Sequence, residues 1–265
     1  GAAAADQHIL FNGNAQDFYV GLDDSADDLI IGKGSTVGTT PAITINEDLQ
    51  TTIAEHKNPR PAFRNLIING DFRVFQRASA STAVGNGSFS TADRWKTYFS
   101  NDGAATSEQH TMSDAERATT GHSYAWQWDV GTADGTIAAG QTAYFRQTIE
   151  AQNCSELAYG SSAAKDLTLS FWVKSAKTGT YSITLQKHDS TSYAYTNTYA
   201  ISSADTWEYK TITITPTAGS TSLITGSAGD IAQDNGKGLI LDFWLAGGSD
   251  YHGTADTWSS NTNHL

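Results

Sequence analysis

The chain has 265 residues, a formal net charge of −12 and 17% charged residues. This acidic balance argues against binding of duplex nucleic acid, because phosphate recognition needs clustered Lys and Arg. No apolar run approaches the ~20 residues of a membrane-spanning helix, so we predict no membrane span. The single Cys154 excludes an intrachain disulfide, and we interpret it as a buried, inert thiol.

Residues 1–58 form a compositionally distinct first segment. They hold nine acidic residues against two lysines, a net charge of −7, and they start without the basic and apolar regions of a secretory signal. Short apolar runs separated by Gly, Asn and Asp predict strands near 8–12, 17–22, 28–32 and 42–46. The acidic turn 23–28 is interpreted as a solvated hairpin tip, because it lacks the pattern of a calcium loop. Strands this short bury little on their own, so we expect the segment to pack against copies of itself.

A domain boundary is predicted at Asn58-Pro59-Arg60-Pro61. The two prolines enforce an extended backbone and remove hydrogen-bond donors that a continuing sheet would use. The predicted domains are therefore residues 1–58 and 59–265.

The most informative motif is NLIINGDFRVFQR at 65–77, followed by TADRW at 91–95. Asn69-Gly70 supplies the positive φ angles of a tight turn, which predicts flanking strands at 66–68 and 72–75. This motif resembles the opening of a jelly-roll module common in phage tail-fibre and receptor-binding proteins, which is itself similar to carbohydrate-binding modules. The segment 166–186 resembles the central hairpin of the same module, and the likeness covers about 62–245.

The resemblance implies an all-β fold: an antiparallel jelly-roll β-sandwich preceded by a short β-rich N-terminal shaft or attachment element. It implies a non-enzymatic virion fibre or appendage protein that is made in the host cytoplasm and attaches to a host-surface glycan outside the cell. The first segment also resembles the trimeric β-rich shafts of phage fibres, which implies a homotrimer with other virion proteins as partners. No cofactor is expected beyond a structural calcium that the resemblance places near Asn69 and Asp71.

Alternation along the later strands predicts which side chains face the core. The row Tyr124, Trp126, Trp128 and Val130 is assigned to the core, and a helical turn is predicted after Ser113. Trp207 and Tyr209 are placed opposite Ile212 and Ile214. The central core is predicted to contain Leu167, Leu169, Phe171, Ile183, Leu185, Leu241 and Phe243.

The side chains that alternate with the core-facing ones, and so point away from the core, include the candidate glycan site. Sugar recognition combines an aromatic plate with planar amide or carboxylate groups that hydrogen-bond hydroxyls. The aromatic and polar side chains of this kind that are predicted on the polar face are Trp172, Trp244, Gln186, His188 and Asp242. A competing interpretation has the same tryptophans covered by loops or by a neighbouring subunit.

Catalytic motifs are absent from the sequence. No phosphate loop, nucleophile elbow or metalloprotease helix occurs. Asp242 with Asp93 or Glu208 is the pair of acids that a glycosidase would use. Two alternative functions remain: a carbohydrate-binding module of a secreted polysaccharide-active enzyme, and a purely structural capsid or tail decoration protein.

The C-terminus is expected to be incomplete. The apolar strand 239–246 is followed by a polar tail without another apolar strand. Either the chain is truncated, which we favour, or a neighbouring subunit covers the open sheet edge. The absence of an initial Met likewise suggests a fragment or a processed product.

Overall fold

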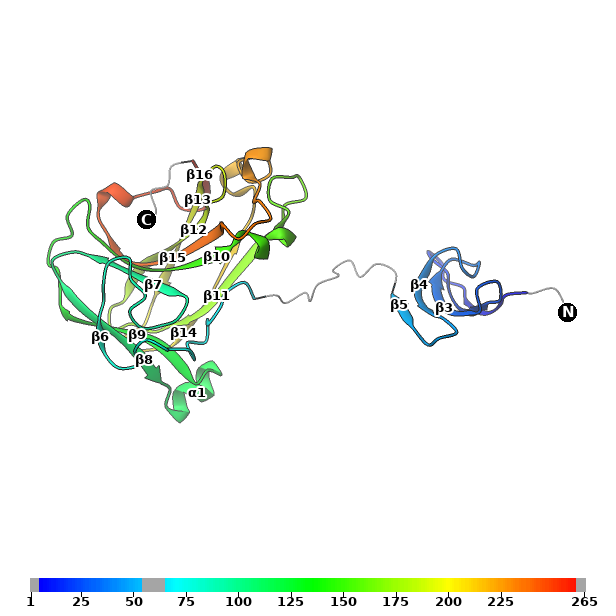
Figure 1. Cartoon of the computed structure of the whole chain (residues 1–265), viewed down its shortest axis with the longest axis horizontal. Coiled ribbons are helices and arrows are strands. Elements are labelled where there is room, and N and C mark those ends of the chain that lie inside the picture. The colour runs from blue at the N-terminus through cyan, green and yellow to red at the C-terminus, as the bar shows by residue number, and fades with distance from the viewer. Residues whose placement is uncertain (1–4, 54–64, 261–265) are drawn as a thin grey trace. The chain divides into compact units, whose positions relative to one another are not determined.

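The computed structural model describes residues 5–53 and 65–260 (Figure 1). The chain divides into two compact units, Gly1–Arg64 and Asn65–Leu265. The boundary predicted after residue 58 lies outside the described residues.

The N-terminal unit is one five-stranded antiparallel sheet in which each strand pairs with the next along the chain. The predicted strand pattern of the first segment is thereby confirmed. The acidic turn is a hairpin tip, because the Asp23 carboxylate accepts hydrogen bonds from the backbone N–H and hydroxyl of Ser25. The strands are β1 Gln7–Phe11, β2 Phe18–Asp23, β3 Asp28–Lys33, β4 Pro41–Ile45 and β5 Thr51–Ile53.

The private core of this unit is small. Only Tyr19, Ile30 and Val37 among its described residues form a buried apolar cluster. The Tyr19 ring lies across Gly32, where an added Cβ would meet the ring hydroxyl at 2.3 Å, so glycine is required there. The expectation that these strands bury little by themselves is confirmed.

The larger unit is an all-β sandwich of antiparallel sheets, as predicted (Figure 1). One layer is a six-stranded sheet with the order β16-β13-β12-β15-β10-β7, and the other consists of the sheets β11-β14 and β6-β8-β9. The first layer comprises β7 Trp95–Ser100, β10 Thr142–Glu150, β12 Gly179–Lys187, β13 Tyr193–Ile201, β15 Lys237–Gly247 and β16 Thr257–Ser259. The second comprises β6 Thr82–Ala83, β8 Ala104–Thr111, β9 Tyr124–Thr132, β11 Leu167–Val173 and β14 Glu208–Ile214.

Short helical segments connect the strands. The single α-helix of the described residues, α1 Asp114–Thr120, begins after the N-cap Ser113 as predicted. The 3₁₀ turns are Ala151–Asn153, Ser155–Leu157, Ala218–Ser220, Ser227–Gly229 and Ser249–Tyr251.

The predicted core is confirmed. Phe171 of β11 packs edge-on against Phe243 of β15, with ring centroids 5.0 Å apart, and so joins the two layers. Cys154 is buried in the same cluster. Ile183, Leu185, Leu241 and Phe243 are buried, and Leu167, Leu169, Phe171 and Trp126 pack against them with part of their surface exposed.

The predicted assignment of side chains to the core is correct on β14 but fails at one residue of β9. Ile212 and Ile214 are buried while Tyr209 is 55% exposed, which confirms the assignment on β14. Val130, by contrast, is 58% exposed, so its assignment to the core is wrong. It lies near the end of β9, beside a β-bulge between Ala104 and Ala105 of β8 that interrupts the regular pairing.

The opening motif forms the predicted turn but not the predicted strands. Asn69 has φ of 55°, yet neither 66–68 nor 72–75 belongs to a strand. The Gln147 side chain takes the place of a neighbouring strand: its Oε1 accepts from the Ile68 N–H at 2.8 Å, and its Nε2 donates to the Ile68 carbonyl at 2.7 Å. Because a side chain satisfies this backbone, no strand ladder forms.

Trp95, the last residue of the second half of the motif, anchors the opening segment to the core. It is 3% exposed, and its indole N–H donates to the Asn69 carbonyl at 3.3 Å. Its ring lies 5.6 Å from Phe72, 5.7 Å from Phe145 and 6.2 Å from Phe243. Trp95 therefore joins the opening segment of the larger unit to aromatic residues of β10 and β15.

Two topological expectations are wrong. The segment 166–186 is not a hairpin, because β11 pairs with β14 whereas β12 pairs with β13 and β15. The chain therefore passes from one layer to the other between β11 and β12. The sheet also has a closing strand after β15: β16 pairs with β13, and the indole of its Trp258 is buried and donates to the Thr215 carbonyl at 2.8 Å.

Glu116 of α1 connects the helix to the sheet. One carboxylate oxygen accepts from the Ser113 N–H at 3.0 Å, and the other accepts from the Lys174 ammonium at 2.7 Å and the Trp207 indole N–H at 3.0 Å. The Lys174 bond, followed by those from Ser113 and Trp207, holds the pKa of Glu116 well below its usual range.

We expect Glu116→Gln to lower the free energy of unfolding by about 1.5–3 kcal/mol at pH 7, because it weakens several charge-assisted hydrogen bonds. The pKa is lowered by folding, so this contribution is present above the unfolded carboxyl pKa and is lost as the pH falls. Urea titrations should therefore show a gap between variant and wild type that narrows below about pH 4. Asp114→Asn, which changes a nearby carboxylate that is 94% exposed, is the control and should shift stability little. Equal effects of the two variants would contradict this role.

Candidate functional site

The outer face of the six-stranded sheet, turned away from the core, carries a polar row across five adjacent strands. The pairing registers place directly neighbouring residues side by side along this row. From the β7 edge inward its members are Lys96, Arg146, Asp242, Thr184 and Thr196. This continuous polar row, with an ion pair at its centre, is the first indication of a site.

Arg146 and Asp242 form the centre of the row. The guanidinium donates from Nε to Oδ1 at 2.6 Å and from Nη2 to Oδ2 at 2.7 Å, while Asp242 is fully buried. Burial raises the pKa of Asp242, and the two bonds from Arg146 oppose that shift. For Arg146, burial acts to lower the pKa, but the bonds to Asp242 outweigh it and raise the pKa above its usual range.

Aromatic rings enclose this ion pair. Tyr98 and Tyr144 stack with centroids 4.6 Å apart, and the Arg146 guanidinium carbon lies 5.1 and 5.3 Å from the two centroids. Tyr144 also contacts Trp244, which lies 5.5 Å from Tyr251 of the C-terminal segment. Burial raises the pKa of Tyr144. The middle of the outer face is therefore filled by the protein itself.

A cleft of about 110 Å³ opens at the β7 edge of this face. Phe89, which is 40% exposed, forms one wall, and the Lys96 ammonium and the Arg77 guanidinium lie over its ring, 4.9 and 5.2 Å from the centroid. The Arg94 guanidinium binds the Glu150 carboxylate, which lowers the pKa of Glu150. The cleft is lined by Phe89, Arg94, Lys96, Arg146, Thr148 and Glu150.

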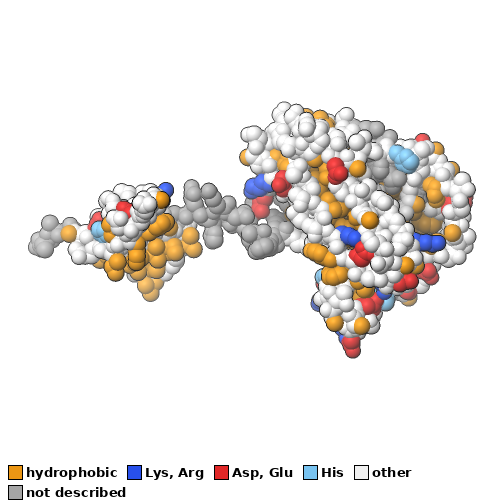
Figure 2. Space-filling model, turned by 180° about the vertical axis from the view of Figure 1, so that it is seen from behind, with side chains coloured by type: hydrophobic (Ala, Val, Ile, Leu, Met, Phe, Trp, Pro, Cys, Tyr) orange, Lys and Arg blue, Asp and Glu red, His pale blue; other side chains and the backbone are white. Residues whose placement is uncertain are grey.

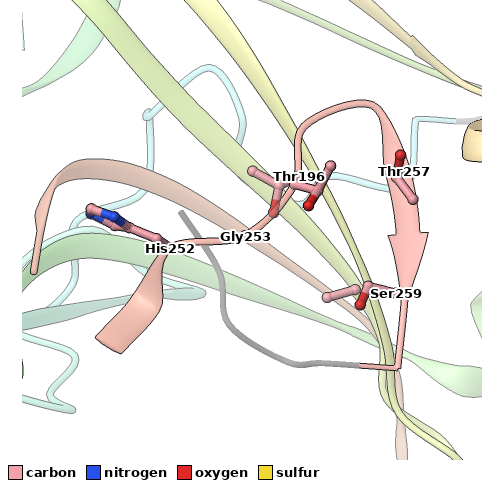
Figure 3. Close-up of a pocket in the computed structure, with 7 residues that line it drawn as sticks. Thr196, His252, Gly253, Thr257 and Ser259 are labelled. Atoms are coloured by element: carbon pink, nitrogen blue, oxygen red, sulfur yellow. The ribbon is translucent and has the colours of Figure 1, made fainter. Parts of the chain in front are cut away.

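A second pocket of about 210 Å³ lies at the opposite end of the same sheet, beside β13 and the edge strand β16 (Figure 3). Hydroxyl-bearing Thr196, Thr257 and Ser259 line it, together with Ala194, His252, Gly253 and Thr254. Its lining contains no aromatic ring other than the imidazole. It therefore offers hydrogen bonds without a stacking surface.

The structure separates the predicted glycan-site residues. Trp172 lies on β11 in the other layer, partly exposed, with its ring 5.3 Å from Tyr209. Asp242, Gln186 and Trp244 share the outer face of the six-stranded sheet, but all three are buried. His188 is half-buried beyond the end of β12, and burial lowers its pKa.

The predicted set therefore does not form one exposed platform. Alternation correctly turned Asp242 and Trp244 away from the core, but it gives no information on what covers the second face. Here Arg146, Tyr144 and Tyr251 cover it. Glycan binding by Trp172 stays a prediction, on a surface distinct from Trp244.

The predicted metal residues have other partners. Asn69 Oδ1 accepts from the Val74 N–H at 3.0 Å, and its Nδ2 donates to the Val74 and Asp93 carbonyls. Asp71 forms an ion pair with Arg73. Among residues 5–53 and 65–260, no three His, Cys, Asp or Glu side chains are grouped to hold a metal ion. A structural calcium at this turn stays a prediction.

The three acids considered for catalysis lie in separate ion pairs. Asp242 binds Arg146, Asp93 binds Arg77, and Glu208 of the other layer binds Lys210. Each carboxylate therefore has its own cation rather than facing a second acid.

Sequence reasoning missed Phe89, Lys96 and Arg146. Alternation does indicate that Lys96 shares a strand face with Tyr98, and that Arg146 shares one with Tyr144. This pattern could have been used to find them. The pairing of β7 with β10, across more than 40 residues, could not have been predicted, because nothing local in either strand specifies its neighbour.

Fold and site together define an all-β protein of two units, with a polar and aromatic outer sheet face. Comparison with protein-family models, curated proteins and solved structures finds no match for this chain. No helix in the described parts of the chain has the length and apolar character needed to cross a bilayer.

Proposed function

We propose that this protein is a phage virion fibre or appendage protein that attaches to saccharides on the host surface through the cleft at Phe89. The attachment is by binding, without catalysis. The proposal combines the sequence resemblance of the opening motif with the chemistry of the cleft.

The exposed Phe89 ring is the observation that carries the binding role. The Lys96 ammonium and the Arg77 guanidinium lie over the ring, so the C–H face of a sugar would stack on the part of the ring that these two cations leave exposed. The paired Arg94 and Glu150 add planar donors and acceptors at the same cleft, which suits the adjacent hydroxyls of a saccharide.

A rigid sheet supports the cleft. Lys96, Arg146 and Thr148 project from paired strands, and Arg146 is held by two bonds to Asp242. A site on strands whose side chains are already fixed loses little conformational entropy when a ligand binds. The Arg146–Asp242 pair thus positions the wall of the cleft.

The virion assignment rests on the resemblance of residues 65–95 and 166–186 to phage fibre modules. The resemblance further implies that the protein is a homotrimer, that it assembles with other virion proteins, and that it is made in the host cytoplasm and acts outside the cell. The small private core of the N-terminal unit is consistent with that assembly.

We expect Phe89→Ala to weaken saccharide binding by about tenfold or more, equivalent to ~1.4 kcal/mol. The full chain and the variant are applied to an array of bacterial surface polysaccharides, and titrations follow on the best ligand. Tyr209→Ala is the matched control, because Tyr209 is an exposed aromatic residue on the other layer, beside Trp172. Loss of binding in Tyr209→Ala with retention in Phe89→Ala would move the site to the Trp172 surface. No saccharide bound by the folded full chain would favour the purely structural role.

A further inference from the structure

One face of the N-terminal sheet is almost entirely apolar. The strand registers place 13 side chains on it, and 10 of them are Ile, Leu, Val or Phe. We call this surface the apolar face. Its apolar members are Ile9, Phe11, Phe18, Val20, Leu22, Leu29, Ile31, Ile43, Ile45 and Ile53.

The apolar face is open to solvent within its own unit. Ile9 is 66% exposed, Phe11 57% and Phe18 51%, and Ile31 in the central strand is still 42% exposed. Figure 2 shows the hydrophobic side chains gathered on one side of this unit. Seven of these side chains leave on the order of 600 Å² of apolar surface in water, the upper end for a soluble monomer.

The centre of the opposite face of the same sheet is covered. Tyr19 and Ile30 lie on it, beneath the segment that carries Val37, and the Tyr19 hydroxyl accepts from the Gly38 N–H at 3.0 Å. The chain therefore covers the centre of one face of this sheet with its own residues, whereas it leaves the centre of the apolar face exposed at Ile31.

Charge distribution indicates the kind of partner. Among residues 5–53, none of the eight acidic residues is one of the 13 side chains that the registers place on the apolar face, and the single cation of that face, Lys33, lies at the end of β3. A partner must therefore present an equally uncharged apolar surface. An anionic lipid surface is disfavoured, because the segment carries a net charge of −7.

We propose that the apolar face packs against the same face of further copies of this chain. In the larger unit, by comparison, the large exposed apolar side chains stand on separate segments, at 68, 74, 89, 130, 137, 209 and 245. The apolar face is thus the one broad surface of matching chemistry on the described residues. Its exposed area approaches the ~800 Å² that each partner gives to a standard interface.

The sheet geometry suits such a contact. Sheets pack face to face at ~10 Å with interdigitated side chains, as in a sandwich, and the alternating Ile and Leu rows provide the required ridges. Two sheets facing each other, or three around a common axis, bury the same residues. This assembly depends on the N-terminal unit alone and not on saccharide binding.

The test is the solution mass of the full chain and of two matched variants, measured by light scattering at ~10 μM. Ile31→Glu places a charge in the centre of the apolar face, whereas Leu10→Glu places it on the opposite face of the sheet, at a residue of similar exposure, 38% against 42%. We expect a multiple of 28.3 kDa for the wild type and Leu10→Glu, and a single-chain mass for Ile31→Glu. A wild-type monomer, an Ile31→Glu oligomer, or equal dissociation of both variants would overturn the proposal.

Hydroxyl-radical footprinting of the unmodified chain makes the test independent of variant folding. Phe11 and Phe18 should be protected at ~10 μM and gain reactivity on dilution below the association range, while Leu49, 82% exposed and outside the apolar face, should react equally at both concentrations. Phe11 and Phe18 as reactive as expected for free side chains at high concentration would contradict the contact. Saccharide binding that survives in a monomeric Ile31→Glu chain separates this outcome from failure of the proposed function.

Discussion

Arg146→Met is expected to lower the free energy of unfolding of the larger unit by about 3–5 kcal/mol, because it leaves the buried Asp242 carboxylate without a counter-charge. Asp242 is 0% exposed and both of its oxygens accept from Arg146. All seven tryptophans lie in this unit, so urea unfolding followed by Trp fluorescence reports on it selectively.

The double variant Arg146→Met/Asp242→Leu is the informative control. Replacing both members of a buried ion pair by apolar residues is often close to neutral, since no uncompensated charge remains. We therefore expect the double variant to recover most of the stability lost in Arg146→Met. A double variant as unstable as the single one would show that the aromatic packing around the guanidinium, rather than the charge balance, holds this face together.

Trp95→Ala is expected to cost about 3–5 kcal/mol, the usual range for deleting a large buried aromatic side chain. Trp95 is 3% exposed and contacts rings from the opening segment, from β10 and from β15. Its removal leaves a cavity between Phe72 and Phe243, and the opening turn also loses the hydrogen bond from the indole to Asn69.

Trp95→Phe separates packing from the hydrogen bond. It keeps most of the apolar surface, so we expect a smaller loss than for Trp95→Ala, again measured by urea unfolding. If Trp95→Ala unfolds with unchanged stability, the opening motif does not anchor the sandwich as its contacts indicate.

The fold class was accessible from the sequence because alternation is local. Leu167 to Val173 and Leu239 to Leu245 each show a period of two, and this alone identified strands and their core-facing side chains. The Ser113 cap was equally readable, since Ser113 and Glu116 form a capping box within one turn.

The pairing of the strands was not accessible in the same way. Leu167–Val173 pairs with a strand about 40 residues later, and the intervening β12 belongs to the other layer. The opening motif failed as a pair of strands for a similar reason: the group that satisfies Ile68 is the side chain of Gln147, far along the chain. Local sequence specifies a strand's faces, whereas its neighbours are set by tertiary packing.

The candidate site was predicted only in part. The alternation correctly assigned Asp242 and Trp244 to the outer face, but their burial depends on two other segments: β10, with Tyr144 and Arg146, and the turn that carries Tyr251. Phe89 lies outside the named strands and has no periodic signal at all. Its exposure became evident only from the structure.

A crystal structure of the full chain with its best-bound oligosaccharide tests the proposed attachment site most directly. We expect one sugar ring stacked on Phe89, with hydroxyls hydrogen-bonded to Lys96, Arg94 or Glu150. A sugar seated instead in the hydroxyl-lined pocket at Thr196, or on the Trp172 and Tyr209 surface, would contradict the assignment of the cleft.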